Sequence, residues 1–482
     1  MQIKFYNSEN QVPMEMHKVR VVQKLHLLPV EERLAKIKEA GNNTFLLQNR
    51  DVFMDMLTDS GVNAMSDNQV AAMGIADDSY AGSETCNRLI DAIEEVFGVR
   101  HFLPAHQGRA CENILAETFV KPGQFVLMNF HFTTTKAHIT RMGGSVIELV
   151  GAEGLVTDSQ HPIKGNFDIE RTKQIIKELG AKNIAFVRIE AGTNLIGGQP
   201  VSLENMLEVA KICKENGIMS ILDASLLQDN LYFMKTREEM CKNMSIKDIM
   251  HKLASVMDIV YFSARKLGFA RGGAIISHNE DYILRMKEYI PLYEGFLTYG
   301  GMEVRSMEAM AVGLRETLDM EYISQGPLFI EYMIKELDKA GVPVVKPAGG
   351  LGAHINAREI LPHIPQSQYP AAALATALYI AGGVRGMERG TLSEQRNPDG
   401  TERFADMELV RLAVPRRVFT LSQLKYCIDR VKWVYDNREL IGGLRWEDEP
   451  RVLRFFFGRL QPIGDWQERL AEKFRADFGD SL

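Results

Sequence analysis

Lys266 and Asp223 are the residues of this sequence whose types and positions are best suited to chemistry. Lys266 follows the strand-like run 258–262, and Asp223 ends a second apolar run, 218–222. A lysine amine that is partly shielded from water can form a Schiff base with an aldehyde cofactor. A carboxylate nearby can hold a pyridine nitrogen protonated, so that the ring accepts electrons. The pair predicts a site for pyridoxal phosphate (PLP), whereas either residue alone is also typical of an ordinary surface loop.

The elements that must position these residues follow from the periodicity of the sequence. Apolar runs predict strands at 125–128, 184–189, 218–222 and 259–262, and helical spacing occurs at 86–97, 169–179 and 203–216. Apolar strands separated by helices are typical of a parallel sheet that is buried on both faces. Catalytic groups in such a sheet lie at the carboxyl ends of the strands. Asp223 and residues 263–266 fall at such ends.

A second, smaller α+β domain is expected after about residue 320. Its predicted elements are a helix that ends near 339, a strand at 409–414 and a helix at 421–436. The segment 385–406 is rich in glycine, arginine and polar residues, which is typical of a functional loop rather than a core element. We expect residues 1–57 to form an N-terminal arm and part of the small domain, 58–320 the large PLP-binding domain, 321–460 the small C-terminal domain, and 461–482 a helical extension.

The C-terminal extension has the pattern of an amphipathic helix. Asp465 and Glu468 have the spacing of a capping box, and an apolar residue recurs every four positions from Trp466 to Phe478. The polar face carries acids as well as bases, which disfavours membrane binding. We expect a terminal helix docked on the body of the protein or on a partner subunit.

Composition limits the class of protein. The 482 residues are 45% hydrophobic and 25% charged, which is typical of a globular protein. A net charge of -7 gives no footprint for nucleic acid, no apolar stretch is long enough to span a membrane, and residues 1–9 lack the layout of a secretory signal. The five cysteines, an odd number without a Cys-x-x-Cys pair, suggest reduced thiols in a cytoplasmic protein. The histidine spacing gives no support for a metal site.

Four further positions suit a PLP site, and each has an ordinary alternative. The segment 106–109 precedes a helical run that begins near residue 110, where backbone N–H groups and Arg109 could hold a phosphate; a generic turn is the alternative. Phe132 could stack on the pyridine ring or belong to the core. Asn194 could donate to the phenolic oxygen of the cofactor or form a turn. Arg411, between apolar neighbours, could bind a substrate carboxylate or form a structural ion pair.

Long motifs across the chain resemble one enzyme family. They are Asn43-Thr-Phe-Leu-Leu47, Leu57-Thr-Asp-Ser-Gly61, Asn63-Ala-Met-Ser-Asp67, Tyr80-Ala-Gly-Ser-Glu84, His106-Gln-Gly-Arg109, Phe132-Thr-Thr-Thr135, Gly197-Gly-Gln-Pro200, Met307-Glu-Ala-Met-Ala311, Met387-Glu-Arg-Gly390 and Pro415-Arg-Arg-Val418. From about residue 28 to 460 the chain resembles the aromatic amino-acid β-eliminating lyases, the family of tyrosine phenol-lyase and tryptophanase, and tyrosine phenol-lyase more closely. The resemblance implies an α/β protein of fold type I, the class of PLP-dependent enzymes with a mostly parallel, seven-stranded central sheet.

The resemblance also implies roles for individual residues. The cofactor would be bound by Gln107, Gly108, Arg109, Phe132, Asn194, Asp223, Ser263, Arg265 and Lys266. The substrate would be bound by Phe45, Thr58, Arg411, Phe455 and Phe456, where Thr58 and Arg411 hold its carboxylate. The catalytic residues would be Lys266, Tyr80, Thr133 and Arg389. Tyr80 would protonate the departing ring carbon from a neighbouring subunit, while Thr133 and Arg389 handle the phenolic hydroxyl. Arg389 favours a phenol over an indole, because tryptophanases have an aliphatic residue there.

Two departures from the family lie around the cofactor. The family has two consecutive lysines followed by aspartate, whereas this chain has Arg265, Lys266 and Leu267. An arginine that supports the phenolic oxygen of the cofactor in the family is replaced by Leu226. These changes put the reaction type in question more than the cofactor or the substrate class.

A third departure concerns a monovalent cation. The family site uses a carboxylate, a backbone carbonyl and an asparagine, and the matching positions here are Asp78, Gly61 and Arg271. A guanidinium has only donors and a fixed positive charge, so Arg271 cannot be a cation ligand. Placed beside Asp78, Arg271 could supply the missing charge itself, so we expect no metal in the family cation site and no requirement for a monovalent cation. The alternative is that Arg271 points to solvent and the cation site survives with fewer ligands.

The leading hypothesis is a PLP-dependent carbon–carbon lyase that acts on L-tyrosine or a ring-substituted tyrosine and releases a phenol, pyruvate and ammonia. An alternative is a biosynthetic PLP enzyme on the same scaffold, performing transamination, β-replacement or oxidative chemistry on a tyrosine-like amino acid. A catalytically silent PLP-binding protein is a further alternative. The expected partners are a small aromatic amino acid and identical subunits, in a homodimer or homotetramer with shared active sites, but no nucleic acid and no membrane.

Overall fold

The computed structural model describes residues 3–6, 11–397 and 399–482. Residues 1–2 and 7–10 of the expected N-terminal arm, and residue 398, lie outside the described residues. The chain clusters into two compact units: unit 1 comprises 60–154 and 161–327, and unit 2 comprises 2–59, 155–160 and 328–482. Within the described ranges, no helix combines the length and the apolarity needed to cross a membrane.

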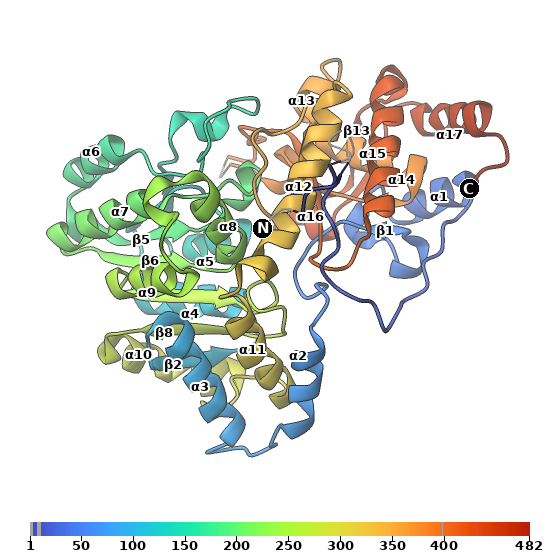
Figure 1. Cartoon of the computed structure of the whole chain (residues 1–482). Coiled ribbons are helices and arrows are strands. Elements are labelled where there is room, and N and C mark those ends of the chain that lie inside the picture. Colours follow the sequence, from blue (N-terminus) through green and yellow to red (C-terminus); the bar gives the residue numbers. More distant parts are fainter. Residues whose placement is uncertain (1–2, 7–10, 398) are drawn as a thin grey trace. The chain divides into compact units, whose positions relative to one another are not determined.

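Unit 1 is built on one large sheet (Figure 1). Its described residues form a seven-stranded sheet in the order β2-β8-β7-β6-β5-β3-β4. The strands are β2 His101–Ala105, β3 Phe125–Met128, β4 Ser145–Glu148, β5 Ile184–Glu190, β6 Met219–Asp223, β7 Ile259–Ser263 and β8 Gly273–Ser277. Only β8 runs antiparallel to both of its neighbours, β2 and β7; the remaining pairs are parallel. This mostly parallel α/β sheet confirms the predicted fold class.

Helices of unit 1 pack on both faces of this sheet. They are α2 Asp67–Ala72, α3 Glu84–Phe97, α4 Gly108–Phe119, α5 Thr133–Arg141, α6 Ile169–Leu179, α7 Leu203–Asn216, α8 Leu227–Arg237, α9 Ile246–Val256, α10 Glu280–Lys287 and α11 Val304–Glu316. On one face, Ile114 of α4 and Ile139 of α5 join Ile221 and Tyr261 of the strands in a common core cluster. On the other face, Phe97 of α3 stacks on a β7 residue, Phe262, with 5.6 Å between ring centroids.

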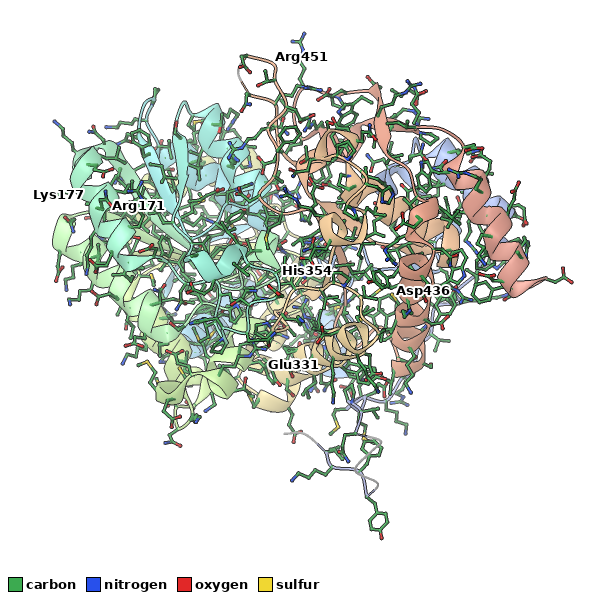
Figure 2. All side chains as sticks on the ribbon, turned by 90° about the horizontal axis from the view of Figure 1, so that it is seen from above. Arg171, Lys177, Glu331, His354, Asp436 and Arg451 are labelled. Atoms are coloured by element: carbon green, nitrogen blue, oxygen red, sulfur yellow. The ribbon has the colours of Figure 1, made fainter. Side chains whose placement is uncertain are left out.

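Local sequence explains the bounds of these helices. The Ser202 hydroxyl accepts a hydrogen bond from the Asn205 amide and caps the start of α7, and Gly217 ends α7 in the left-handed conformation at φ 65°. Helix α6 is amphipathic, and Figure 2 shows its Arg171 and Lys177 on the outer side. The observed α6 and α7 have the predicted bounds because, in each helix, the apolar stripe and the capping residues indicate the same start and end.

Unit 2 combines small sheets with helices around its own core. In its described residues, β9 Gly352–Asn356, β11 Met387–Arg389 and β12 Leu409–Ala413 form an antiparallel sheet, β1 Met54–Asp55 pairs with β10 Val384–Arg385, and β13 Leu444–Asp448 pairs with β14 Arg459–Pro462. Its helices are α1 Val30–Glu39, α13 Ala357–Ile360, α14 Pro370–Gly382, α15 Leu421–Asp436, α16 Arg454–Phe457 and α17 Trp466–Phe478, and α12 Met320–Lys339 begins in unit 1 and ends in unit 2. Helix α14 is buried on all sides.

Two expectations for this unit are wrong. The segment 385–406 is not a loop throughout, because Arg385 belongs to β10 and residues 387–389 form β11, all buried. Arg385 is paired within this unit, and its Nε donates to Asp55 Oδ1 at 2.9 Å. Asp465 precedes α17 but does not cap it; its carboxylate lies 3.1 Å from Arg469 Nε instead. As expected, α17 buries its apolar stripe, and it does so against unit 2 itself.

The antiparallel sheet of unit 2 buries two carboxyl groups close together. Glu388 accepts hydrogen bonds from the Ser393 hydroxyl at 2.9 Å and from the Gly390 amide. Glu408 accepts a bond from the Thr391 amide at 2.9 Å. Burial and the nearby Glu408 raise the pKa of Glu388 to about 7. Glu388 is therefore a buried acid that titrates near neutral pH.

We predict that the free energy of unfolding of Glu388→Gln, compared with that of wild type, increases as pH rises from 5 to 8. The pKa of Glu388 in the folded protein lies above its ordinary value of 4.5, so the folded state holds the proton more tightly than the unfolded state does. The free energy of unfolding of wild type therefore falls as pH rises through about 7. The loss is on the order of 3 kcal/mol, and a neutral amide avoids it. Thermal unfolding midpoints at several pH values measure the effect, with Glu472→Gln on the exposed face of α17 as the control. Parallel curves for all three proteins would contradict the prediction.

Candidate active site

Asp223 lies where the carboxyl ends of three parallel strands meet. It pairs in register with Glu190 at the end of β5 and with Tyr261 of β7. Its Oδ2 accepts hydrogen bonds from the Tyr261 hydroxyl at 2.9 Å and from the Arg188 guanidinium, and its Oδ1 accepts one from the Ser225 amide at 2.9 Å. The carboxylate is therefore held in one orientation by charged and neutral donors.

Arg188 is the buried cation of this group, and sequence reasoning did not single it out. Its side chain is only 1% exposed. Its Nε donates to the Tyr261 hydroxyl at 2.8 Å, its Nη1 to Glu190 at 3.2 Å, and its Nη2 to Asp223. The signal was present in the sequence, because an arginine within an otherwise apolar strand must find partners when it is buried.

The carboxyl groups around Arg188 are buried too. Burial raises the pKa of Glu190, and Arg188 opposes that rise. The same two effects act on the pKa of Glu112 of α4, whose two oxygens accept the hydroxyls of Thr134 and Thr135 at 2.6 and 2.7 Å. Burial also raises the pKa of Tyr261 well above its ordinary value, so the phenol keeps its proton. The Arg188 cation thus interacts with three buried carboxyl groups, those of Glu112, Glu190 and Asp223.

Lys266 lies beside the predicted aromatic residue. Its Nζ is 5.4 Å from the centroid of the Phe132 ring, and its charge opposes the rise that burial causes in the pKa of Glu190. Asn194, whose backbone amide donates to Glu190 Oε1 at 3.2 Å, starts a 3-10 turn four residues after the end of β5. The structure therefore places Lys266 beside Phe132, and both Lys266 and Asn194 near Glu190, the neighbour of Asp223 in the sheet.

The start of α4 approaches the end of β7 closely. A Cβ atom on Gly108, the first residue of α4, would lie 2.7 Å from Ser263 Cβ, and one on Gly273 would lie 3.1 Å from the Gly108 nitrogen. Only glycine permits this approach. Gln107 precedes the helix as its N-cap residue. The first N–H groups of a helix have no intrahelical partner and suit an anion.

Positive charge surrounds this helix start. Burial lowers the pKa of Arg265, and the charges of Arg271 and Arg109 act in the same direction. Arg265 donates to the hydroxyl and the carbonyl of Ser60, both at 3.2 Å. A glycine-lined helix N-terminus with arginines nearby fits a phosphate dianion. With the Asp223 carboxylate and the Lys266 amine, these residues fit the three polar ends of PLP.

Unit 2 places two further predicted residues on one sheet face. Arg389 of β11 and Arg411 of β12 belong to adjacent antiparallel strands, and Arg411 pairs with Met387 on one side and His354 on the other. Positions in register or two residues apart share a face. Burial, Arg411 and Arg389 together lower the pKa of His354 to about 3, so that histidine is neutral. Arg411 donates to the Leu57 carbonyl at 2.7 Å, next to Thr58.

The three predicted phenylalanines of unit 2 form one cluster. The Phe45 ring lies 5.5 Å from that of Phe455 and 4.9 Å from that of Phe456, and the latter two are 4.0 Å apart. Their mutual edge and tilted contacts are those expected of packed aromatic rings. The structure thus joins residues that are more than four hundred positions apart in the sequence.

The remaining predicted residues, Tyr80, Thr133, Asp78 and Arg271, have no contact among the described residues that supports their expected roles. Tyr80 is 66% exposed and stacks on Phe296 at 5.1 Å. The buried Thr133 hydroxyl has no hydrogen-bond partner among the described residues. Asp78 and Arg271 are both exposed, and in the described part of the chain they form no ion pair, so a direct contact between them is not supported.

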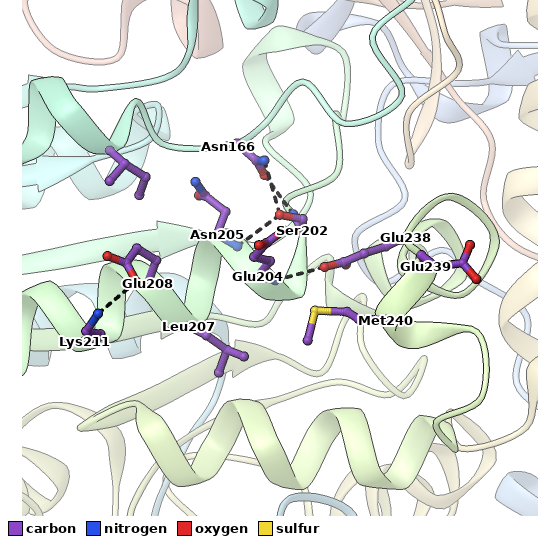
Figure 3. Close-up of a pocket in the computed structure, with 11 residues that line it drawn as sticks. Asn166, Ser202, Glu204, Asn205, Leu207, Glu208, Lys211, Glu238, Glu239 and Met240 are labelled. Atoms are coloured by element: carbon purple, nitrogen blue, oxygen red, sulfur yellow. Dashed lines mark hydrogen bonds and ion pairs between the residues drawn. The ribbon is translucent and has the colours of Figure 1, made fainter.

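A hollow of about 830 Å³ beside α7 contains none of these residues (Figure 3). Its Glu238 carboxylate accepts the backbone amides of Leu203 and Glu204 at 2.8 and 3.0 Å, and therefore caps the start of α7. Lys211 pairs with Glu208 at 3.6 Å. Because its charged groups serve the local fold, this hollow is not the candidate site.

Comparison with known proteins gives consistent results. A family profile for β-eliminating lyases matches residues 55–429. Tyrosine phenol-lyase from Pasteurella multocida is 41% identical over 93% of this chain and 99% of its own length. The enzymes of the same name from Clostridium tetani and Symbiobacterium thermophilum are 42% and 40% identical, and cover 92% and 93% of this chain and 97% and 98% of their own lengths.

Solved structures share the fold at low sequence identity. A serine palmitoyltransferase from S. paucimobilis, solved with PLP bound, is 12% identical, has a TM-score of 0.57 and covers 82% of this chain and 90% of its own. A threonine aldolase from Leishmania major is 14% identical, has a TM-score of 0.55 and covers 79% and 99%. These structures confirm fold type I, and the similarity to the full-length relatives confirms the resemblance seen in the motifs. The chain belongs to the β-eliminating lyase family.

Proposed function

We propose that this protein is a PLP-dependent lyase that cleaves L-tyrosine, or a ring-substituted tyrosine, into a phenol, pyruvate and ammonia. The observation that carries the proposal is the placement of Lys266 near the buried Asp223 group, beside Phe132. The relatives named tyrosine phenol-lyase support the substrate class. Arg389 supports a phenolic side chain, since its guanidinium suits an oxygen rather than an indole ring.

Residues of unit 1 would hold the cofactor. Lys266 would bind it covalently, Asp223 would keep its ring nitrogen protonated, Phe132 would stack on the ring and Asn194 would contact its phenolic oxygen. The phosphate would be held by residues around the start of α4, namely Gln107, Gly108, Arg109, Ser263 and Arg265. When bound, PLP supplies an electron-withdrawing ring conjugated to the substrate Cα.

The remaining residues would act on the substrate. Arg411 and Thr58 would bind its carboxylate, and the Lys266 amine, once the substrate amine has displaced it from the cofactor, would remove the Cα proton. Arg389 and Thr133 would handle the phenolic hydroxyl proton while the Tyr80 phenol protonates the ring carbon, so that the carbon–carbon bond breaks and a phenol leaves. Water then converts the remaining three carbons and nitrogen into pyruvate and ammonia. Phe45, Phe455 and Phe456 would surround the aromatic ring.

The proposal extends to organisation and assembly. We propose that unit 1 forms the large PLP-binding domain and unit 2 the small domain. The exposure of Tyr80 supports a role in the active site of a neighbouring identical subunit, within a homodimer or homotetramer. A cytoplasmic location fits the five buried free thiols.

An assay of products tests the function directly. With L-tyrosine we expect equal amounts of phenol and pyruvate, and with L-tryptophan little indole. Release of indole without phenol would contradict the role of Arg389. Binding of tyrosine that alters the PLP absorbance without producing pyruvate would favour a biosynthetic enzyme on the same scaffold.

The purified protein should be yellow, and borohydride should abolish the visible absorbance by fixing PLP to Lys266. Lys266→Ala should lose the label, since Lys266 is the amine that lies beside Phe132 and Glu190. The exposed Lys211→Ala, in the same unit, is the matched control and should be labelled as wild type. Peptide mapping identifies the modified residue, and a label on another lysine would overturn the assignment.

Arg389→Ile should reduce kcat/KM for tyrosine by a factor on the order of a hundred or more, while elimination from S-alkyl cysteines is affected far less. Only a phenolic substrate needs its hydroxyl proton managed before the ring carbon is protonated. Steady-state kinetics on both substrates measure the difference. Equal losses on both would mean that Arg389 has a structural role.

We propose that PLP binding and turnover do not require a monovalent cation, because Arg271 brings a fixed positive charge. Rates in potassium, sodium and tetramethylammonium buffers of equal ionic strength should agree. The double variant Arg271→Asn with Asp78→Glu should acquire potassium dependence. A severalfold activation of wild type by potassium would refute the idea.

A further inference from the structure

The buried Arg188 makes hydrogen bonds with all three nitrogens of its guanidinium, so it orients its partners as well as neutralising their charge. Its three donor nitrogens reach three different groups on three adjacent strands: Glu190 on β5, Asp223 on β6 and Tyr261 on β7. The Tyr261 hydroxyl accepts from Arg188 and donates to the same Asp223 oxygen, Oδ2, that Arg188 contacts. Two donors therefore converge on Oδ2.

The other oxygen of Asp223 is less occupied. Among the described residues, Oδ1 accepts only the Ser225 amide, at 2.9 Å. A carboxylate oxygen can accept two hydrogen bonds. The arrangement thus makes the two oxygens of one carboxylate unequal, and it leaves Oδ1 able to accept a second donor.

We propose that Arg188 is a positioning residue that, with Tyr261, occupies Oδ2 of Asp223, leaves Oδ1 to the ring nitrogen of the cofactor, and limits how strongly that nitrogen holds its proton. This inference rests on the proposed binding of PLP. The physical reason is that a cation in contact with a buried carboxylate offsets part of the field that would otherwise stabilise a protonated ring. How strongly the ring withdraws electrons then depends on Arg188 and Tyr261 as well as on Asp223.

Two other carboxyl groups, those of Glu190 and Glu112, also lie near Arg188. Glu190 is held by Arg188 Nη1 and by the Asn194 amide, both at 3.2 Å. Glu112 of α4 adds a third carboxyl group to the surroundings of Arg188 and is bonded to two threonine hydroxyls. Burial raises the pKa of both glutamates, and the Arg188 charge opposes that rise. Asp223 differs from both glutamates in that one of its oxygens, Oδ2, accepts from Arg188 and from the Tyr261 hydroxyl at once.

The experiment follows the ring nitrogen itself. PLP labelled with ¹⁵N in the ring is bound to wild type and to the double variant Arg188→Met with Glu190→Gln, in which Gln keeps an acceptor for the Asn194 amide. The nitrogen chemical shift is recorded across pH. In the double variant we expect the shift to move toward that of a protonated ring, and its titration midpoint to rise by about one unit or more. Tyr261→Phe should shift it in the same direction by less.

Controls separate this inference from the proposed function and from folding. Arg315→Met, which removes an exposed arginine paired with Glu95, should leave the nitrogen shift unchanged. If PLP does not attach to Lys266 in wild type, the proposed function fails. If it attaches and the double variant has the wild-type nitrogen shift at every pH, this inference alone is overturned. Should the double variant not fold, Tyr261→Phe and Arg188→Lys decide, and an unchanged nitrogen shift in both would overturn it.

Discussion

The burial of Arg188 among carboxyl groups is the constraint on which the rest of the site depends. Removing a guanidinium and a carboxylate from water costs several kcal/mol each, and the cost is offset only when geometry and hydrogen bonding are good. The register of β5, β6 and β7 supplies that geometry, since it places Glu190, Asp223 and Tyr261 side by side. Once the strands are in register, the orientation of Asp223 is fixed without any ligand.

The other end of the proposed cofactor site, where the phosphate would bind, depends on close contact between backbone segments rather than on ion pairs. Gly108 and Gly273 allow the start of α4 to lie against β7 and β8, where a side chain at either position would meet neighbouring atoms at 3.1 Å or less. Rigid elements therefore position the residues that we propose for both ends of PLP, the phosphate and the ring nitrogen, and such preorganisation is what a cofactor enzyme needs. Lys266 lies on the short connection between β7 and β8, so its amine is carried by the same two strands.

Much of this could be predicted from the sequence where local and tertiary signals agree. Residues 169–179, 203–216 and 421–436 coincide with α6, α7 and α15, because an apolar stripe lies between identifiable caps. Strand β8 is not among the strands that the sequence predicts, and the need for glycine at its first residue, Gly273, follows from the approach of α4, a tertiary contact. The sequence does not predict the strands around Arg385, because the partner that pairs this buried arginine, Asp55, is distant in sequence. The sequence does not predict Arg188 as part of the site because two of its three partners, Asp223 and Tyr261, lie on strands that only the fold brings next to β5.

The central claim is that Asp223, held by this buried network, enables proton removal from the substrate Cα. It is tested most directly by exchange of the Cα proton of L-tyrosine in deuterated water, which does not depend on departure of the phenol. With Asp223→Asn, which keeps the shape but not the charge, the account predicts that PLP remains attached to Lys266 while exchange slows by about a hundredfold or more. Exchange within a fewfold of the wild-type rate, with PLP attached at Lys266, would contradict the account.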